Sequence, residues 1–126
     1  MSNVVEKPWG HENRWAVTDK YLGKILHINP GHRLSRQYHE AKDESIYVLE
    51  GELVLEIGLD ERIEKFILGP GATWRIEAGT IHRFAAPSNG CVLIEVSTPE
   101  IDDVVLDSIN AKAIEACVSD PLTEVN

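Results

Sequence analysis

The stretch that decides the fold is GHRLSRQYHEAKDESIYVLEG, residues 31–51. Gln37 and His39 are two residues apart on an expected strand, so both side chains point to the same face. Glu44 opens a second strand that runs to a turn at Gly51, and a hairpin between the two strands folds its carboxylate back beside His39. The stretch therefore predicts a polar site supported by β-strands.

Strand patterns continue on both sides of this stretch. Residues 53–57 and 92–97 alternate in the two-residue repeat of a strand that has two different faces. Shorter β-rich runs bounded by turn residues occupy 25–28, 45–49, 63–68 and 73–76. Their spacing favours an antiparallel sandwich or barrel. Only the tail has helical spacing, with one apolar face formed by Ile109, Ala113, Ile114, Cys117 and Val118.

Size and charge exclude several classes of protein. The chain has 126 residues and a mass of 14.1 kDa, which predicts a single domain over residues 1–126. Its formal net charge is −9, which repels a phosphate backbone, so we expect no nucleic-acid partner. Apolar residues make up 43% of the chain, enough to bury a core.

The N-terminal residues, the apolar runs and the cysteines indicate where in the cell the protein is located. Residues 1–7 lack an apolar run of signal-peptide length, and no segment approaches the roughly 18–20 apolar residues of a membrane span. We therefore expect a cytoplasmic protein without a membrane partner. Cys91 and Cys117 are far apart and lack CxxC spacing, which favours buried thiols over a disulfide or a thiolate metal site.

A second histidine extends the polar site. His82 follows the turn-like residues 78–80 and begins another strand. Together, Gln37, His39, Glu44 and His82 offer two imidazole nitrogens and two oxygens without sulfur. This set suits Zn, Mn, Fe, Co or Ni and does not suit Cu(I). A single histidine on a strand is more often a hydrogen-bonded or exposed residue than a ligand, so spacing alone leaves both interpretations open.

Two segments resemble the motifs of the cupin superfamily. Residues 31–51 are similar to the first cupin motif, with Gln37 in place of its first histidine. Residues 71–86 are similar to the second, which they match at Gly71, Gly79 and His82 but not at Glu77 and Ala86. The resemblance implies an all-β, small single-domain cupin, a double-stranded β-helix or jelly-roll barrel, followed by a short C-terminal helix. It also implies one divalent metal ion bound by Gln37, His39, Glu44 and His82. Zn is the expected metal, and Mn, Ni, Co and Fe are the alternatives.

A narrower resemblance points to one cupin family. Residues 34–44 are similar to the L-S-x-Q-x-H-x-x-R-x-E signature of cupin-type mannose-6-phosphate isomerases, with Lys42 in place of the arginine. Residues 7–10 resemble that family's R-P-W-G, and residues 94–105 its I-E-V and E-D-D-I-V segments. The match ends near residue 107, and Leu106 stands where an arginine is usual. It implies metal-dependent aldose–ketose isomerisation of a phosphorylated sugar. The broader cupin resemblance implies a homodimer.

Candidate substrate ligands follow from strand alternation. If the strand from Arg33 to His39 is regular, Arg33 and Ser35 share the inward face and form a phosphate grip beside the metal. The isomerase resemblance independently implies Ser35. Lys42 and Arg83 are further candidates, although Arg83 adjoins His82 and faces the opposite side unless a bulge intervenes. No residue is identified as the catalytic base.

Two other functions stay open from the sequence. A metal- or sugar-binding module without turnover is favoured by the absence of the isomerase family's C-terminal segment. A dioxygenase uses the same barrel with Fe(II), but Gln37 in place of a histidine speaks against it.

Overall fold

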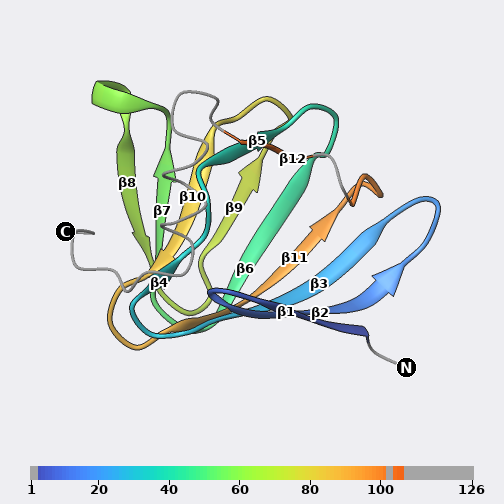
Figure 1. Cartoon of the computed structure of the whole chain (residues 1–126), viewed down its shortest axis with the longest axis horizontal. Helices are drawn as coiled ribbons and strands as arrows, with labels where there is room; N and C mark the ends of the chain where they lie inside the picture. Colours follow the sequence, from blue (N-terminus) through green and yellow to red (C-terminus); the bar gives the residue numbers. More distant parts are fainter. Residues whose placement is uncertain (1–2, 102–103, 107–126) are drawn as a thin grey trace.

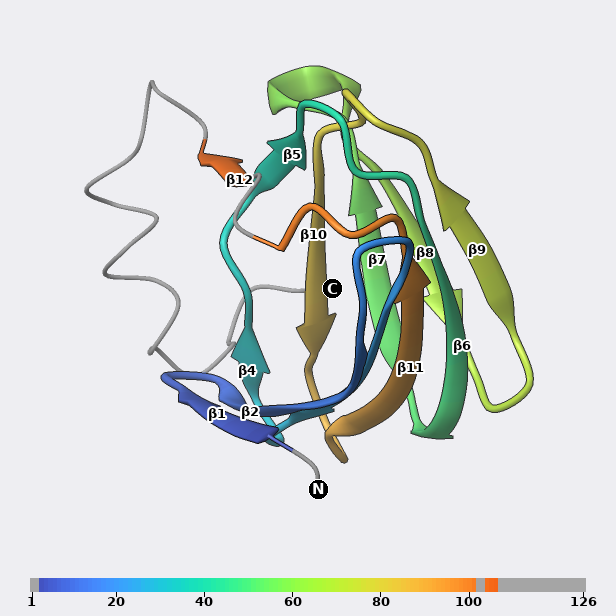
Figure 2. The same cartoon turned by 90° about the vertical axis from the view of Figure 1, so that its right-hand side faces the viewer.

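The strands form two facing antiparallel sheets in a computed structural model that describes residues 3–101 and 104–106 (Figures 1 and 2). Sheet A contains, in spatial order, β1 (Asn3–Lys7), β2 (Gly10–Val17), β3 (Leu22–Ile28), β11 (Cys91–Ser97), β6 (Glu44–Gly51) and β9 (Thr73–Ile76). Sheet B contains β12 (Val104–Leu106), β5 (Gln37–His39), β10 (His82–Ala86), β7 (Leu53–Ile57) and β8 (Glu64–Leu68), and β4 (His32–Arg33) also pairs with β10. The one helical turn among the described residues is the 3-10 helix η1 (Asp60–Arg62), which connects β7 to β8.

The predicted all-β class is confirmed, and the sheets form the predicted jelly roll. Strands β3, β6, β7, β8, β9 and β11 cover the segments that the sequence predicts as strands. Strands β1 and β2 were not predicted. The predicted C-terminal helix and Cys117 lie outside the described residues. None of the described helices has the length and apolarity to span a membrane.

The predicted hairpin between the two strands of residues 37–51 is wrong. Strand β5 pairs with β10 and β12 in sheet B, whereas β6 pairs with β11 and β9 in sheet A. The chain therefore crosses from one sheet to the other between His39 and Glu44. The two side chains still meet, because each points into the space between the sheets.

The next crossing between the sheets needs a glycine. Gly51 ends β6 with a φ of 77°, a left-handed conformation that L-residues with a side chain rarely adopt. A Cβ atom there would lie 2.1 Å from the carbonyl oxygen of Gly90. This close approach explains the glycine that ends the first motif.

The hydrophobic core fills one part of the space between the sheets. Its fully buried members include Val48, Leu53, Leu55 and Leu93, and Trp74 packs against them from β9. Each such side chain contributes about 1.5–3 kcal/mol by leaving water. The remaining part of the inter-sheet space holds charged side chains, which the next section describes.

Candidate metal centre

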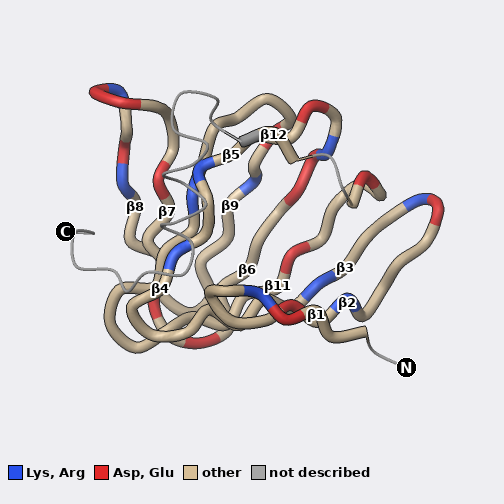
Figure 3. Tube along the Cα trace, viewed as in Figure 1, with Lys and Arg blue, Asp and Glu red and all other residues tan. Residues whose placement is uncertain are grey.

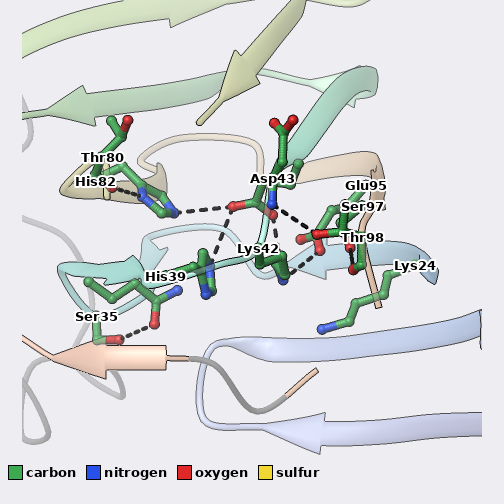
Figure 4. A network of polar contacts seen from close by, with 12 residues as sticks. Lys24, Ser35, His39, Lys42, Asp43, Thr80, His82, Glu95, Ser97 and Thr98 are labelled. Atoms are coloured by element: carbon green, nitrogen blue, oxygen red, sulfur yellow. Dashed lines mark hydrogen bonds and ion pairs between the residues drawn. The ribbon is translucent and has the colours of Figure 1, made fainter. Parts of the chain in front are cut away.

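Three buried side chains from three strands converge between the sheets. His39 ends β5, His82 begins β10, and Glu44 begins β6 on the opposite sheet. Their ligand atoms all lie within 4.8 Å of one another. Nε2 of His39 is 3.5 Å from Oε1 of Glu44, and Nε2 of His82 is 3.4 Å from the same oxygen. Figure 4 shows both imidazole rings turned toward one point.

The hydrogen bond of His82 shows which ring nitrogen carries the proton and which is left as a metal ligand. Nδ1 of His82 lies 2.8 Å from the carbonyl oxygen of Thr80, and a carbonyl can only accept, so Nδ1 carries the proton. In the neutral ring, Nε2 then presents a lone pair toward Oε1 of Glu44. Both atoms are buried and neither has a hydrogen-bond partner. A cation between them would satisfy both, so the residues fit a metal ion, and the Thr80 contact is the outer support typical of metal-binding histidines.

The electrostatics keep Glu44 ready to bind a cation. Burial works to raise the pKa of Glu44, and the positive charge of the Lys42 ammonium group is among the effects that outweigh it. The pKa is therefore held well below its usual range. A carboxylate that stays ionised without exposure to water is suited to a divalent metal.

Gln37 and Ser35 stand beside this cluster. Gln37 is the backbone partner of His82 between β5 and β10, so the two side chains share a face. The hydroxyl of Ser35 donates to Oε1 of Gln37 over 3.3 Å. Both residues line the same cavity as the cluster. Ligation of a metal by Gln37 stays a prediction.

Lys42 and Glu95 continue the polar network on the side of sheet A. Nζ of Lys42 is 2.9 Å from Oε2 of Glu95 and 3.7 Å from Oε2 of Glu44. Burial and the charge of Glu44 raise the pKa of Glu95 to about 7. Burial works to lower the pKa of Lys42, but the charges of Glu95 and Glu44 outweigh it and raise that pKa. Glu95 was not singled out from the sequence.

A cavity of about 460 Å³ is lined by His39 and Glu44 of the cluster. Its volume lies in the range of small-molecule sites, roughly 300–1,000 Å³. Apolar walls are formed by Trp9, Leu26, Leu34 and Phe84, and charged side chains of β1, β2 and β3 complete it. The cavity can therefore hold a small polar molecule next to a metal.

The predicted inward position of Arg33 is wrong. Leu34 and Ser35 are consecutive, yet both line the cavity, so the alternation of faces is broken between β4 and β5. Arg33 pairs with Ala85 of β10 and lies on the outer face of sheet B. It is not among the residues that line the cavity.

Arg83 also lies outside the cavity, as strand alternation from His82 predicts. Its guanidinium donates to both oxygens of Glu56 over 3.2 and 3.4 Å. Arg36 contacts the same carboxylate and donates to the carbonyl of Gly58. Of the four predicted substrate ligands, the structure thus places Ser35 and Lys42 at the cavity, and Arg33 and Arg83 on the outer face of sheet B.

Comparison with known proteins identifies the family. Residues 24–97, more than half of the chain, match the family model described as Cupin domain. The chain belongs to the cupin family. The matched segment contains His39, Glu44 and His82, and the metal-ligand cluster of this cupin is built by its two motif regions. No curated protein matches the sequence.

Solved structures with the same fold include proteins of different function. KdgF from Halomonas sp. has a TM-score of 0.69 and 24% identity, over 80% of this chain and 91% of that chain. CapF of Staphylococcus aureus, a capsular polysaccharide assembling protein, has a TM-score of 0.71 and 16% identity over 84% of this cupin and 34% of CapF. Lactobacillus farciminis oxalate decarboxylase has a TM-score of 0.71 and 20% identity over 89% of this cupin and 35% of that chain. This cupin spans about a third of the latter two proteins, and at these identities the likeness shows the fold alone.

Proposed function

We propose that this cupin is a metal-dependent isomerase that interconverts an aldose phosphate and a ketose phosphate, as mannose-6-phosphate isomerases do. The observation that supports it is the buried cluster of His39, Glu44 and His82, whose facing ligand atoms call for a cation at the wall of a cavity. The similarity of residues 34–44 to the isomerase signature supplies the reaction class.

The residues around the cavity have distinct tasks in this reaction. His39, Glu44 and His82 would hold the metal, which would supply a Lewis acid for the carbonyl and hydroxyl oxygens of the sugar. Lys42 lines the cavity beside Glu44 and provides N–H donors that can orient a sugar oxygen. Trp9 and Phe84 form apolar walls that exclude water from the proton transfer between C1 and C2.

Incubation of metal-loaded protein with mannose 6-phosphate and with fructose 6-phosphate tests the proposal. We expect each sugar phosphate to appear from the other, followed by NMR, and Glu44→Gln to abolish the conversion. Arg75→Gln, a change of an exposed residue on β9, is the matched control and should keep full activity. Stoichiometric metal without conversion of any of several aldose phosphates would contradict the proposal.

The second candidate is a cupin that binds metal and sugar without turnover. It is favoured by Leu106, which stands where the isomerases usually have an arginine. Metal-dependent binding of a sugar phosphate without conversion would support this candidate. The phosphorylated substrate, the homodimer and the cytoplasmic location all stay predictions.

A further inference from the structure

We propose that the cavity contains an anion subsite on sheet A, in which Arg14 and Lys24, positioned by Glu12, bind the phosphate group of the substrate. The subsite replaces the phosphate grip that the sequence predicts at Arg33. The inference rests on the proposed function for the identity of the anion, and it names where the charged end of the substrate lies.

Glu12, Arg14 and Lys24 lie in contact on one wall of the cavity. Arg14 on β2 and Lys24 on β3 are backbone partners, and all three side chains line the cavity. Oε1 of Glu12 lies 2.8 Å from Nε of Arg14 and 3.4 Å from Nζ of Lys24. Glu12 thus contacts both cations and fixes their positions on the cavity wall.

The guanidinium group of Arg14 has donors that Glu12 does not use. Glu12 contacts Arg14 through Nε, so the two terminal nitrogens of the guanidinium are not used by this carboxylate. A phosphate takes donors from a guanidinium in pairs, and an ammonium group adds further donors beside it. The side chain of Arg14 is 21% exposed, whereas those of Lys24 and Glu12 are 8% and 6% exposed. Arg14 therefore stands nearer to the open side of the cavity and Lys24 deeper.

The cavity wall formed by β1, β2 and β3 carries more positive than negative charge. Burial works to raise the pKa of Glu12, but Lys24, Arg14 and Lys7 outweigh it, so Glu12 stays ionised. On β1, β2 and β3, the cations Lys7, Arg14 and Lys24 face the cavity with this one carboxylate, and Glu95 faces it from the neighbouring strand β11. Figure 3 shows the basic segments of β1, β2 and β3 side by side, in a chain whose net charge is −9. The excess of positive charge on this wall favours an anion.

A series of contacts links the proposed subsite to the potential metal ligands. Lys24 is the backbone partner of Glu95 between β3 and β11, and Glu95 contacts Lys42, which contacts Glu44. The network thus runs along sheet A from the proposed subsite to the metal-binding cluster. In Figure 4, Lys42 and Glu95 lie between Lys24 and His82. A substrate with a phosphate at one end and its reacting carbons at the other would span this path.

A purely structural role of these charges is the alternative. Buried ion pairs contribute little net stability compared with apolar side chains, so stability alone is a weak reason to place them on a cavity wall. The two roles differ in what a substitution changes. A structural pair changes the melting temperature, whereas a subsite changes the affinity for the anion.

The test compares Arg14→Gln and Lys24→Met with wild type in metal-loaded protein. Calorimetric titration with mannose 6-phosphate and with uncharged mannose measures affinity, and a turnover assay measures KM and kcat. We expect each variant to weaken mannose 6-phosphate binding and to raise KM at least about 10-fold. Mannose affinity, metal content and kcat should stay within about threefold, because contacts equal in ground and transition states change KM alone.

Three controls keep the subsite and the proposed function separate. Lys65→Met, on exposed β8, should leave affinity for mannose 6-phosphate unchanged, and Arg14→Lys should restore part of it. Absence of turnover in wild type, with sugar-phosphate binding that still needs Arg14 and Lys24, would support the subsite and contradict the isomerase. Turnover with unchanged KM in both variants would overturn the subsite alone. Binding of glucuronate in preference to mannose 6-phosphate would overturn the assignment to phosphate.

Discussion

Two clusters of buried charge lie on either side of sheet B and differ in whether the oxygens of their carboxylates are satisfied. The inner cluster joins His39, Glu44 and His82. His39 and Glu44 line the cavity, and two ligand atoms of the cluster have no hydrogen-bond partner. In the outer cluster, Glu56 accepts hydrogen bonds on both oxygens from guanidinium groups. A carboxylate whose oxygens are all satisfied holds its neighbours in place, whereas facing unsatisfied ligand atoms indicate a binding site.

Strand alternation alone separates these two clusters. His82 and Arg83 are adjacent on β10, yet His82 faces Glu44 between the sheets and Arg83 faces Glu56 on the outer side. The same alternation on β7 places Leu55 in the core and Glu56 on the outer face. A charged residue next to a motif histidine is therefore no guide to the composition of the site.

The largest effect on stability is expected from the outer cluster. Glu56→Ala leaves the guanidinium groups of Arg36 and Arg83 without their shared carboxylate. Breaking a buried pair in this way typically costs about 3–5 kcal/mol of the free energy of unfolding. Urea denaturation measures the loss, and metal affinity of the folded variant should match wild type. A loss below about 1 kcal/mol would show that the outer cluster does not stabilise the fold.

The same cluster predicts a dependence of stability on pH. Burial works to raise the pKa of Glu56, but the hydrogen bond from Arg36 and the charge of Arg83 outweigh it and lower that pKa below its unfolded value. The stabilisation is therefore present above the unfolded pKa, about 4.3, and is lost as pH falls through the folded pKa. The difference in free energy of unfolding between wild type and Glu56→Gln should be constant near neutral pH and shrink below about pH 4. A difference that grows on acidification would contradict this origin.

A smaller effect tests whether Gln37 belongs to the metal site. Ser35→Ala removes the hydrogen bond that orients the Gln37 amide. If Gln37 is a ligand, metal affinity should fall about 10-fold, as it does when outer supports of metal ligands are removed. Competition with a chelator measures the affinity, and Thr73→Ala on the exposed edge of β9 is the control. Unchanged affinity in Ser35→Ala would leave His39, Glu44 and His82 as the protein ligands.

The smallest effect is expected at Arg33. Its place on the outer face of sheet B predicts that Arg33→Gln leaves KM for a sugar phosphate within about twofold of wild type. Arg14→Gln in the same assay should raise KM at least about 10-fold. A larger effect of Arg33→Gln than of Arg14→Gln would restore the phosphate grip that the sequence suggested.

The convergence of His39, Glu44 and His82 could be predicted because its signals are local. Gln37 and His39 share a face by their spacing, and Glu44 and His82 each stand at the start of a strand after turn-like residues. The route by which His39 and Glu44 meet could not be predicted, because a hairpin and a crossing between sheets leave similar patterns in a short segment. Pairing partners far along the chain decide between them.

Lys24 was a weak candidate from the sequence, but Glu12, Arg14 and Glu95 on the charged cavity wall were missed because their strands have an inverted pattern. On β11, Leu93 and Glu95 are buried while Val96 is 49% exposed, so an apolar residue faces outward beside an inward carboxylate. On β2, Glu12 lines the cavity and Trp15 is 51% exposed. A hydrophobic pattern assigns apolar residues to the interior, and it fails where the interior is a polar cavity.

Metal stoichiometry in variants of the histidines decides whether His39, Glu44 and His82 form a metal site. Purified wild type and a His39→Ala/His82→Ala double variant are stripped with a chelator, titrated with Zn²⁺ by calorimetry, and checked for folding by circular dichroism. We expect one tightly bound equivalent per chain in wild type and none in the folded double variant, because both imidazoles and Glu44 converge on one point. One equivalent retained with unchanged affinity by the double variant would contradict it.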